Sequence, residues 1–217
     1  MTATATAAPA GAAGSAQVEE VKRTWPARDH RGPIEVRTPR VVVPGNASAT
    51  AAIQSALAEF LEVGEDDVRV DYRVSFNARG FLDLTVVHET VTAYPDQHEE
   101  HYLFELGSGR RLRAADLFRS EKRAQLVAAV DAKMQEAIQA VGRDSPDCAD
   151  VEQEPRHFSA DRLREVRLES QALTILYDFD FPHVIQACEP SGEFRFTAAE
   201  IEPYLASGTG ITEALAK

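Results

Sequence analysis

Histidine and glutamate gather in one short stretch of the chain, and these residue types hold zinc-like ions in proteins. His88 lies late in one expected strand, and His98, Glu99 and His101 open the next. With a tight turn between the strands, the hairpin would place His88 opposite residues 102–103. His88 and His101 would then be close enough to share an ion, with Glu99 as an oxygen ligand. One hypothesis is therefore a metal-dependent hydrolase.

Two features of the spacing count against this hypothesis. The segment His-Glu-Glu-His at 98–101 is not the HExxH pattern, which needs two histidines four residues apart on a helix. In a strand, residues three apart point to opposite faces, so His98 and His101 cannot both face one ion. Polar residues at a solvated hairpin end explain the same stretch, so we assign no metal and no cofactor.

The rest of the chain carries no recognisable catalytic motif. The sequence lacks the GxSxG, Walker A and GxGxxG patterns. The Gly-Ser-Gly at 107–109 is typical of a turn after a strand. Neither Cys148 nor Cys188 has a histidine partner nearby in sequence. We assign no catalytic residue, and the sequence favours a non-catalytic protein over an enzyme.

The two cysteines lie far apart and follow no zinc-binding spacing. A disulfide between them would imply an exported protein, but one distant pair is weak support for that pairing. Two independent thiols are the favoured interpretation.

Charge limits the kinds of partner. The net charge is −12 and the sequence pI is near 5.0. Nucleic-acid binding requires many Lys and Arg residues to neutralise phosphates, and anionic lipid also repels such a protein. An acidic protein can attract a basic partner, and such a complex loses affinity as salt rises. We expect no nucleic acid as a partner.

The N-terminal region differs in composition from the rest. Residues 1–33 are predicted to form a disordered tether, because its Ala, Thr, Pro and Gly cannot bury enough surface. Its start lacks the basic and Leu-rich parts of a signal peptide, and the chain has no membrane-spanning stretch. Trp25 lies in this tether and either folds back onto the domain or anchors a partner, since Trp is enriched at interface hot spots.

Periodicity along residues 34–206 predicts one α+β domain, followed by a tail at 207–217. Helical spacing predicts helices over 46–64 and 120–142, and a capping box at Thr197 and Glu200 starts a short third helix. We expect a mainly antiparallel β-meander packed by two main helices plus a short C-terminal helix, without βαβ alternation. Alternating apolar residues indicate strands at 34–43, 68–76, 82–86, 102–106, 166–168, 173–177 and 194–196.

Several segments, in order, resemble one protein family. They are VVVP at 41–44, YRVSFNARGFLDL at 72–84, YLFELGSGRRL at 102–112 with DLF at 116–118, and FP, FRFT and EIEPYL between 181 and 205. They are similar to the extracytoplasmic domains of RsiV-type anti-sigma factors, the partner domain of PdaC-type peptidoglycan deacetylases, and secreted mycobacterial antigens of the same module. The family's Gly-Gly-Ala-His type segment before the third strand is replaced here by residues 93–98.

The resemblance implies a sensor or binding module at the bacterial envelope. We therefore predict a non-catalytic module that recognises a protein or cell-wall ligand outside the cytoplasm, with His88, His98, Glu99, His101 and Trp25 as candidate ligand-binding residues. The partner is expected to be basic if net charge guides it. A metal-dependent hydrolase remains one alternative. A cytosolic interaction protein of the same fold is another, favoured if Met1 is the true start.

Overall fold

The computed structural model describes residues 14–26, 33–58, 63–64, 66–91, 95–148 and 156–216. Contacts divide the chain into two compact units, an N-terminal unit, Met1–Leu112, and a C-terminal unit, Arg113–Lys217. Both units combine helices with antiparallel strands, which confirms the predicted α+β class. Within the described residues, no helix is both long and apolar enough to span a membrane.

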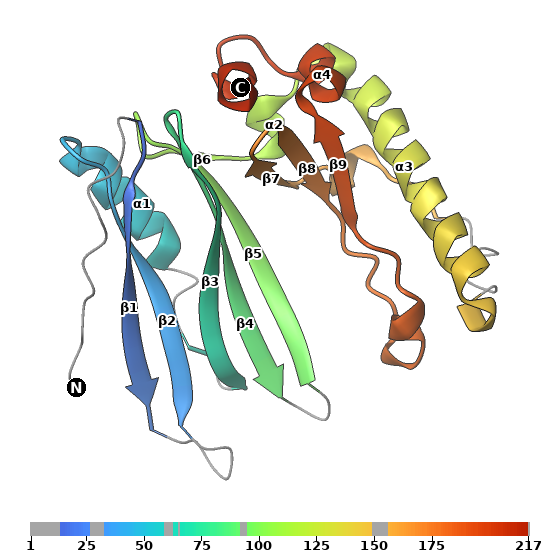
Figure 1. The fold of residues 1–217 in the computed structure, drawn as a ribbon, viewed down its shortest axis with the longest axis horizontal. Helices are drawn as coiled ribbons and strands as arrows, with labels where there is room; N and C mark the ends of the chain where they lie inside the picture. The colour runs from blue at the N-terminus through green and yellow to red at the C-terminus, as the bar shows by residue number, and fades with distance from the viewer. Residues whose placement is uncertain are drawn as a thin grey trace. The chain divides into compact units, whose positions relative to one another are not determined.

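One sheet and one helix build the described part of the N-terminal unit: β1 (Gln17–Trp25), β2 (Ile34–Val42), α1 (Ala47–Ala58), β3 (Asp67–Ala78), β4 (Phe81–Val91), β5 (Pro95–Glu105) and β6 (Arg111–Leu112). The six strands follow the order β1-β2-β3-β4-β5-β6, and α1 lies against the sheet (Figure 1). All neighbours are antiparallel except β2 and β3, which are parallel. Contrary to the sequence-based expectation, α1 therefore completes one βαβ unit, because parallel neighbours need a crossover.

The core of the N-terminal unit lies between α1 and one face of the sheet. Ile53 and Leu57 on α1 are fully buried. Leu82, Leu84 and Val86 alternate along β4 and are equally buried in the same cluster, as strand periodicity predicts. This face therefore supplies most of the apolar surface that holds the sheet to the helix.

Backbone approaches closely at the start of α1. Asn46 caps the helix, because its Oδ1 accepts the Ala49 N–H at 3.0 Å. Its Nδ2 also donates to the Gly107 carbonyl at 2.8 Å. A Cβ on Gly109, whose φ is +76°, would lie 2.6 Å from the Ala49 carbonyl oxygen. The connection between β5 and β6 thus packs directly on the helix, and this contact requires glycine.

Strand β1 lies within residues 1–33, where the sequence predicts a tether. All nine of its residues pair with β2, and it forms one edge of the sheet. Asn77, at the end of β3, fixes its start: the Asn77 side chain accepts the Ala16 N–H and donates to the Ala16 carbonyl, both at 2.8 Å. The sheet therefore begins before residue 34. The remaining tether segments, 1–13 and 27–32, lie outside the described residues.

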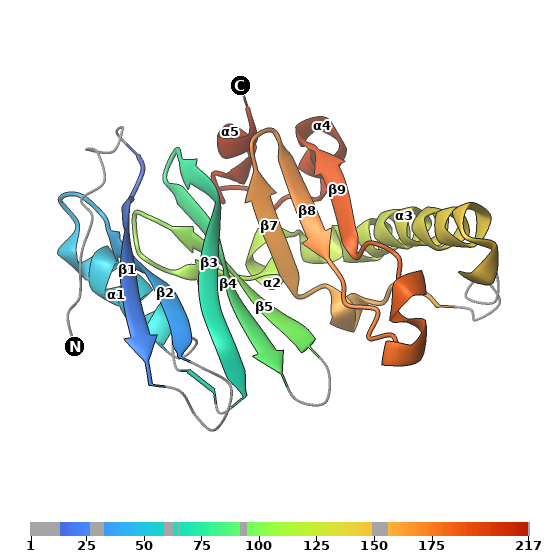
Figure 2. The same ribbon diagram turned by 60° about the horizontal axis from the view of Figure 1, so that its bottom comes forward.

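The C-terminal unit contains three strands, four α-helices and short 3₁₀ turns among its described residues: α2 (Ala114–Leu117), η1 (Ser120–Lys122), α3 (Arg123–Asp144), η3 (Ala160–Arg162), β7 (Glu165–Glu169), β8 (Ala172–Leu176), η4 (His183–Cys188), β9 (Glu193–Thr197), α4 (Ala198–Ile201), η5 (Glu202–Tyr204) and α5 (Ile211–Leu215). The strands form an antiparallel sheet, β7-β8-β9, and α3 contacts it at β9 (Figure 2). The buried face of α3 is formed by Leu126, Val130, Met134 and Ile138. The predicted capping box is confirmed, with Thr197 and Glu200 bonded reciprocally.

A disulfide joins Cys148, which follows α3, to Cys188 at the end of η4. The interpretation as two independent thiols is therefore wrong. The two residues are 40 positions apart in sequence. They meet only because the chain returns through the β7–β8 hairpin to the end of α3, and sequence spacing carries no sign of that return.

Candidate functional site

The predicted histidine hairpin is formed by β4 and β5, and its register differs from the expected one. His88 pairs with His98. The placement of His88 opposite residues 102–103 is wrong, because β5 already begins at Pro95 and the returning strand therefore meets β4 four residues earlier.

The predicted metal ligands lie on two faces of this hairpin. His88 and His98 are directly opposite each other and share one face, whereas Glu99 and His101 occupy register positions on the other. His101 Nδ1 lies 2.9 Å from the Thr85 hydroxyl, and its side chain is buried. Among the residues that the structure describes, no group of three His, Cys, Asp or Glu side chains could hold a metal ion. The geometry gives the hydrolase hypothesis no support.

Two of these residues hold the hairpin to β3. His88 Nδ1 is 2.9 Å from the carboxylate of Asp67, which is buried and also accepts the Gly64 N–H at 2.6 Å. On the other face, the guanidinium of Arg73 lies 2.5 Å from the carboxylate of Glu99. These contacts give both residues a structural role: His88 links β4 to its neighbour β3, and Glu99 links β5 to β3 across β4.

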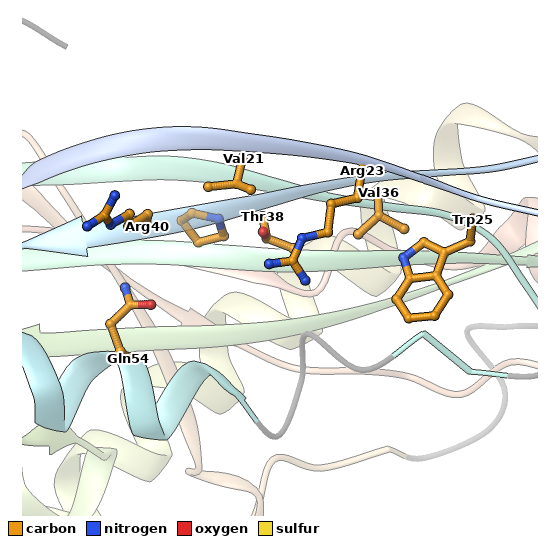
Figure 3. A pocket seen from close by; sticks show the side chains of 8 residues that line it. Val21, Arg23, Trp25, Val36, Thr38, Arg40 and Gln54 are labelled. Atoms are coloured by element: carbon orange, nitrogen blue, oxygen red, sulfur yellow. The ribbon is translucent and has the colours of Figure 1, made fainter. Parts of the chain in front are cut away.

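A pocket of about 240 Å³ lies between β1, β2 and α1, and we call it the β1–β2 pocket (Figure 3). Val21, Arg23 and Trp25 alternate along β1 and therefore present their side chains to one face. The rest of the lining comes from β2 and α1 through Val36, Thr38, Pro39, Arg40 and Gln54.

Trp25 is the last residue of β1 and has two kinds of contact. Its ring packs partly against the hydrophobic core of the N-terminal unit. It also lines one end of the β1–β2 pocket, beside Arg23 (Figure 3). The tryptophan predicted to lie in a tether is therefore half-buried and is paired across the strands with Ile34.

Positive charge in the β1–β2 pocket is only partly compensated. Arg40 lies 3.7 Å from Glu19. By contrast, within the described part of the chain, no carboxylate lies at ion-pair distance from the exposed guanidinium of Arg23. In Figure 3 that guanidinium extends between Thr38 and Trp25. The Arg23 guanidinium carries five N–H groups, as does that of Arg40 in the same pocket.

Acidic groups surround the pocket without lining it. Glu20 on β1 lies 2.9 Å from Lys22. Burial, and then the charges of Glu20 and Asp71, raise the pKa of Tyr72 on β3, so its hydroxyl stays protonated at neutral pH. Arg23 therefore faces an open pocket, while nearby carboxylates are occupied by other side chains.

The lining of the β1–β2 pocket suits binding more than catalysis. The described lining offers an indole, two guanidinium groups, one amide and one hydroxyl, and no histidine, cysteine or carboxylate is among these residues. General acid–base catalysis needs such a titratable group near the reacting atoms. Sequence reasoning missed Arg23, since its alternation with Trp25 has meaning only if residues 17–25 form a strand.

Comparison with known proteins identifies the fold. No protein-family model matches the sequence, and no curated protein matches it. A DUF3298 family member from Bacteroides fragilis NCTC 9343 is similar with a TM-score of 0.60 at 11% identity, over 93% of this chain and 98% of that one. A DUF3298 family protein from Pseudomonas aeruginosa PAO1 gives a TM-score of 0.61 at 10% identity, over 88% and 94%. These structural neighbours come from a family of unknown function, and at such identities the similarity shows the fold alone.

Proposed function

We propose that this chain is a non-catalytic binding module of the bacterial envelope that recognises a protein or cell-wall ligand through the β1–β2 pocket. The observation that carries the proposal is the placement of Trp25 beside the guanidinium of Arg23, which has no ion pair among the described residues, on the edge strand of the described sheet. Concave sites that combine apolar walls with a few polar groups are typical binding sites. Trp and Arg are also the residues most enriched at binding hot spots.

The disulfide supports the proposed compartment. Disulfides persist in exported proteins and are rare in the reducing cytosol. The bond between Cys148 and Cys188 therefore favours an extracytoplasmic module over the cytosolic alternative. Alkylation of thiols in the native protein should label neither cysteine before reduction and both afterwards. Labelling without reduction would contradict this compartment.

Capture from an envelope extract tests the binding role. Immobilised wild-type protein should retain a specific partner, and the Trp25→Ala variant should lose it, because removing the indole removes the apolar wall of the pocket. Chelator should have no effect on retention. Quantitative mass spectrometry of the retained material measures both results.

The matched control is Val74→Ala, which removes an exposed apolar side chain from β3 of the same sheet. This variant should retain the partner. Urea unfolding confirms that each variant is folded. Equal retention by wild type and Trp25→Ala, or retention that depends on metal, would overturn the proposed function.

A further inference from the structure

We infer that the ligand of the β1–β2 pocket is an acidic segment of extended peptide, which adds as a strand beside β1 and places a carboxylate on Arg23. This inference rests on the proposed function, since it names the class of partner for the same pocket. Its basis is the position of β1 at the edge of the described sheet, the alternation of Arg23 with Trp25, the size of the pocket and its local charge.

The edge of β1 is available for pairing. β1 stands at the end of the strand order and, among the strands that the structure describes, has β2 as its single neighbour. Its nine residues end in an exposed stretch, residues 22–24. An edge strand leaves backbone N–H and C=O groups open on one side, and an extended peptide can pair with them.

The alternation along β1 sets the pattern of the added strand. Residues directly opposite each other on neighbouring strands point to the same face. A peptide residue opposite Arg23 would therefore project over the pocket, and the residue two positions away would lie opposite Trp25. The expected pattern is an acidic residue and an apolar residue separated by one position.

The volume of the pocket favours one group of a longer ligand. At about 240 Å³ it lies below the roughly 300–1,000 Å³ typical of pockets that hold whole small molecules. A pocket of this size takes a side chain, while the adjoining strand edge takes the backbone. A polymer segment therefore fits the two features together.

Local charge outweighs net charge in this contact. The chain carries −12, which repels an acidic ligand at long range. Salt screens that repulsion beyond about 8–10 Å at physiological ionic strength. A charge-assisted hydrogen bond between Arg23 and a carboxylate acts at contact distance and changes affinity about tenfold. We therefore expect the site to bind acidic peptides more tightly than neutral ones. The affinity should depend weakly on salt, because salt weakens both the long-range repulsion and the contact pair.

Peptide pools test the inference with the full chain. Three immobilised pools of nonapeptides carry Glu, Gln or Lys at the central position and mixed residues elsewhere. Wild type should bind the Glu pool about tenfold more tightly than the Gln pool. Arg23→Gln should abolish this preference, and Arg23→Glu should shift it to the Lys pool. Lys22→Gln, which removes the same charge from the other face of β1, should leave it unchanged.

Strand addition has its own signature. Proline placed at every second position of a selected peptide should abolish binding, because at those positions the peptide N–H donates to β1. Equal binding of all three pools, or an unchanged preference in Arg23→Glu, would overturn the inference. The proposed function would survive if an envelope partner were still captured through Trp25, and competition by glucuronic acid would then identify an acidic sugar. Failure of the proposed function is recognised separately, as equal capture by wild type and Trp25→Ala.

Discussion

The two units hold their arginines in different ways. In the C-terminal unit, Arg167 on β7 donates to both carboxylate oxygens of Glu193, at 2.9 and 2.7 Å, and to Glu169 at 3.0 Å. The hydrogen bond to Glu193 is the main reason that the pKa of Arg167 is raised. In the N-terminal unit, Arg23 has no comparable ion pair among the described residues. An arginine whose N–H groups are bonded to carboxylates on neighbouring residues stabilises the sheet. An arginine without such partners can bind a ligand.

The units also differ in the interactions that stabilise them. The C-terminal unit has a covalent cross-link between Cys148 and Cys188. The described part of the N-terminal unit depends on packing, including the contact of Gly109 with α1. Trp25 is the single tryptophan of the chain, so its fluorescence follows the N-terminal unit alone. The helix signal in circular dichroism is weighted toward the C-terminal unit, because α3 has 22 residues and α1 of the N-terminal unit has 12.

Removing the disulfide should give the largest difference between the units. Closing 40 residues corresponds to about 4 kcal/mol in the chain-entropy model. The double variant Cys148→Ala/Cys188→Ala should therefore lose about 3–4 kcal/mol of unfolding free energy in the helix signal. Trp25 fluorescence should change little in urea titrations. Equal shifts of both signals would show that the two units unfold together, and the contrast would fail.

Gly109→Ala should destabilise the N-terminal unit by roughly 3 kcal/mol, because the new Cβ meets backbone at a positive φ. Gly80→Ala is the matched control, since its φ is +85° and nothing lies within 4 Å of the added Cβ. That variant should cost about 1 kcal/mol from backbone strain alone. Trp25 fluorescence in urea measures both. Equal losses would show that the close approach to α1 is unimportant.

Removing each arginine should separate structure from binding. Arg167→Gln should lower the unfolding free energy of the C-terminal unit by about 1–2 kcal/mol, because it removes the charged hydrogen bonds to Glu193 and Glu169, although Glu169 keeps Arg195 at 3.4 Å. Arg23→Gln should change stability by less than about 0.5 kcal/mol, since that side chain is exposed. Urea unfolding with both probes measures these values. A loss of stability in Arg23→Gln similar to that in Arg167→Gln would remove the distinction.

Acid should weaken the C-terminal unit slightly through Asp131 on α3. Burial raises the pKa of Asp131. Hydrogen bonds from the Phe158 N–H, His157 and Gln135 together lower it by more, so the net pKa is below the usual range. Ionised Asp131 therefore contributes its full stabilisation of the folded unit above the unfolded pKa of about 4. This stabilisation is lost as pH falls through the folded pKa. Asp131→Asn should cost about 1 kcal/mol at pH 7 and less at pH 3.

Helix unfolding in urea between pH 3 and pH 7 measures this difference. Asp144→Asn, at the exposed end of the same helix, is the matched control and should change the unfolding free energy by less than about 0.5 kcal/mol at pH 7. A constant difference between wild type and Asp131→Asn across this range would contradict the role of the lowered pKa.

Strands with an apolar face could be predicted from the sequence, and strands without one could not. The alternation at 68–76 and 82–86 predicted β3 and β4 correctly, and the turn between them has positive φ at Arg79 and Gly80. β1 is an edge strand with charged residues at four of its nine positions, so its apolar alternation is weak. Without β1, the pocket could not be foreseen.

Contacts between residues far apart in the sequence could not be predicted either. The register of β4 and β5 depends on where β5 begins, and its first residues, from Pro95 onward, are polar and exposed. Apolar periodicity marked only the buried part of that strand. The disulfide partner of Cys148 likewise depends on the return of the chain after β8, which spacing does not encode.

The clasp between Asn77 and Ala16 also has a consequence in time. These residues are 61 positions apart, so the start of β1 leaves the ribosome well before the side chain that holds it. At roughly 5–20 residues per second, the interval is about 3–12 s. A hairpin of β1 and β2 can pair during this interval. Ala16, just before β1, cannot bond to Asn77 until the end of β3 has been synthesised. An exported chain would meet the same order of events on the far side of the membrane, where Ala16 is held only after β3 has followed.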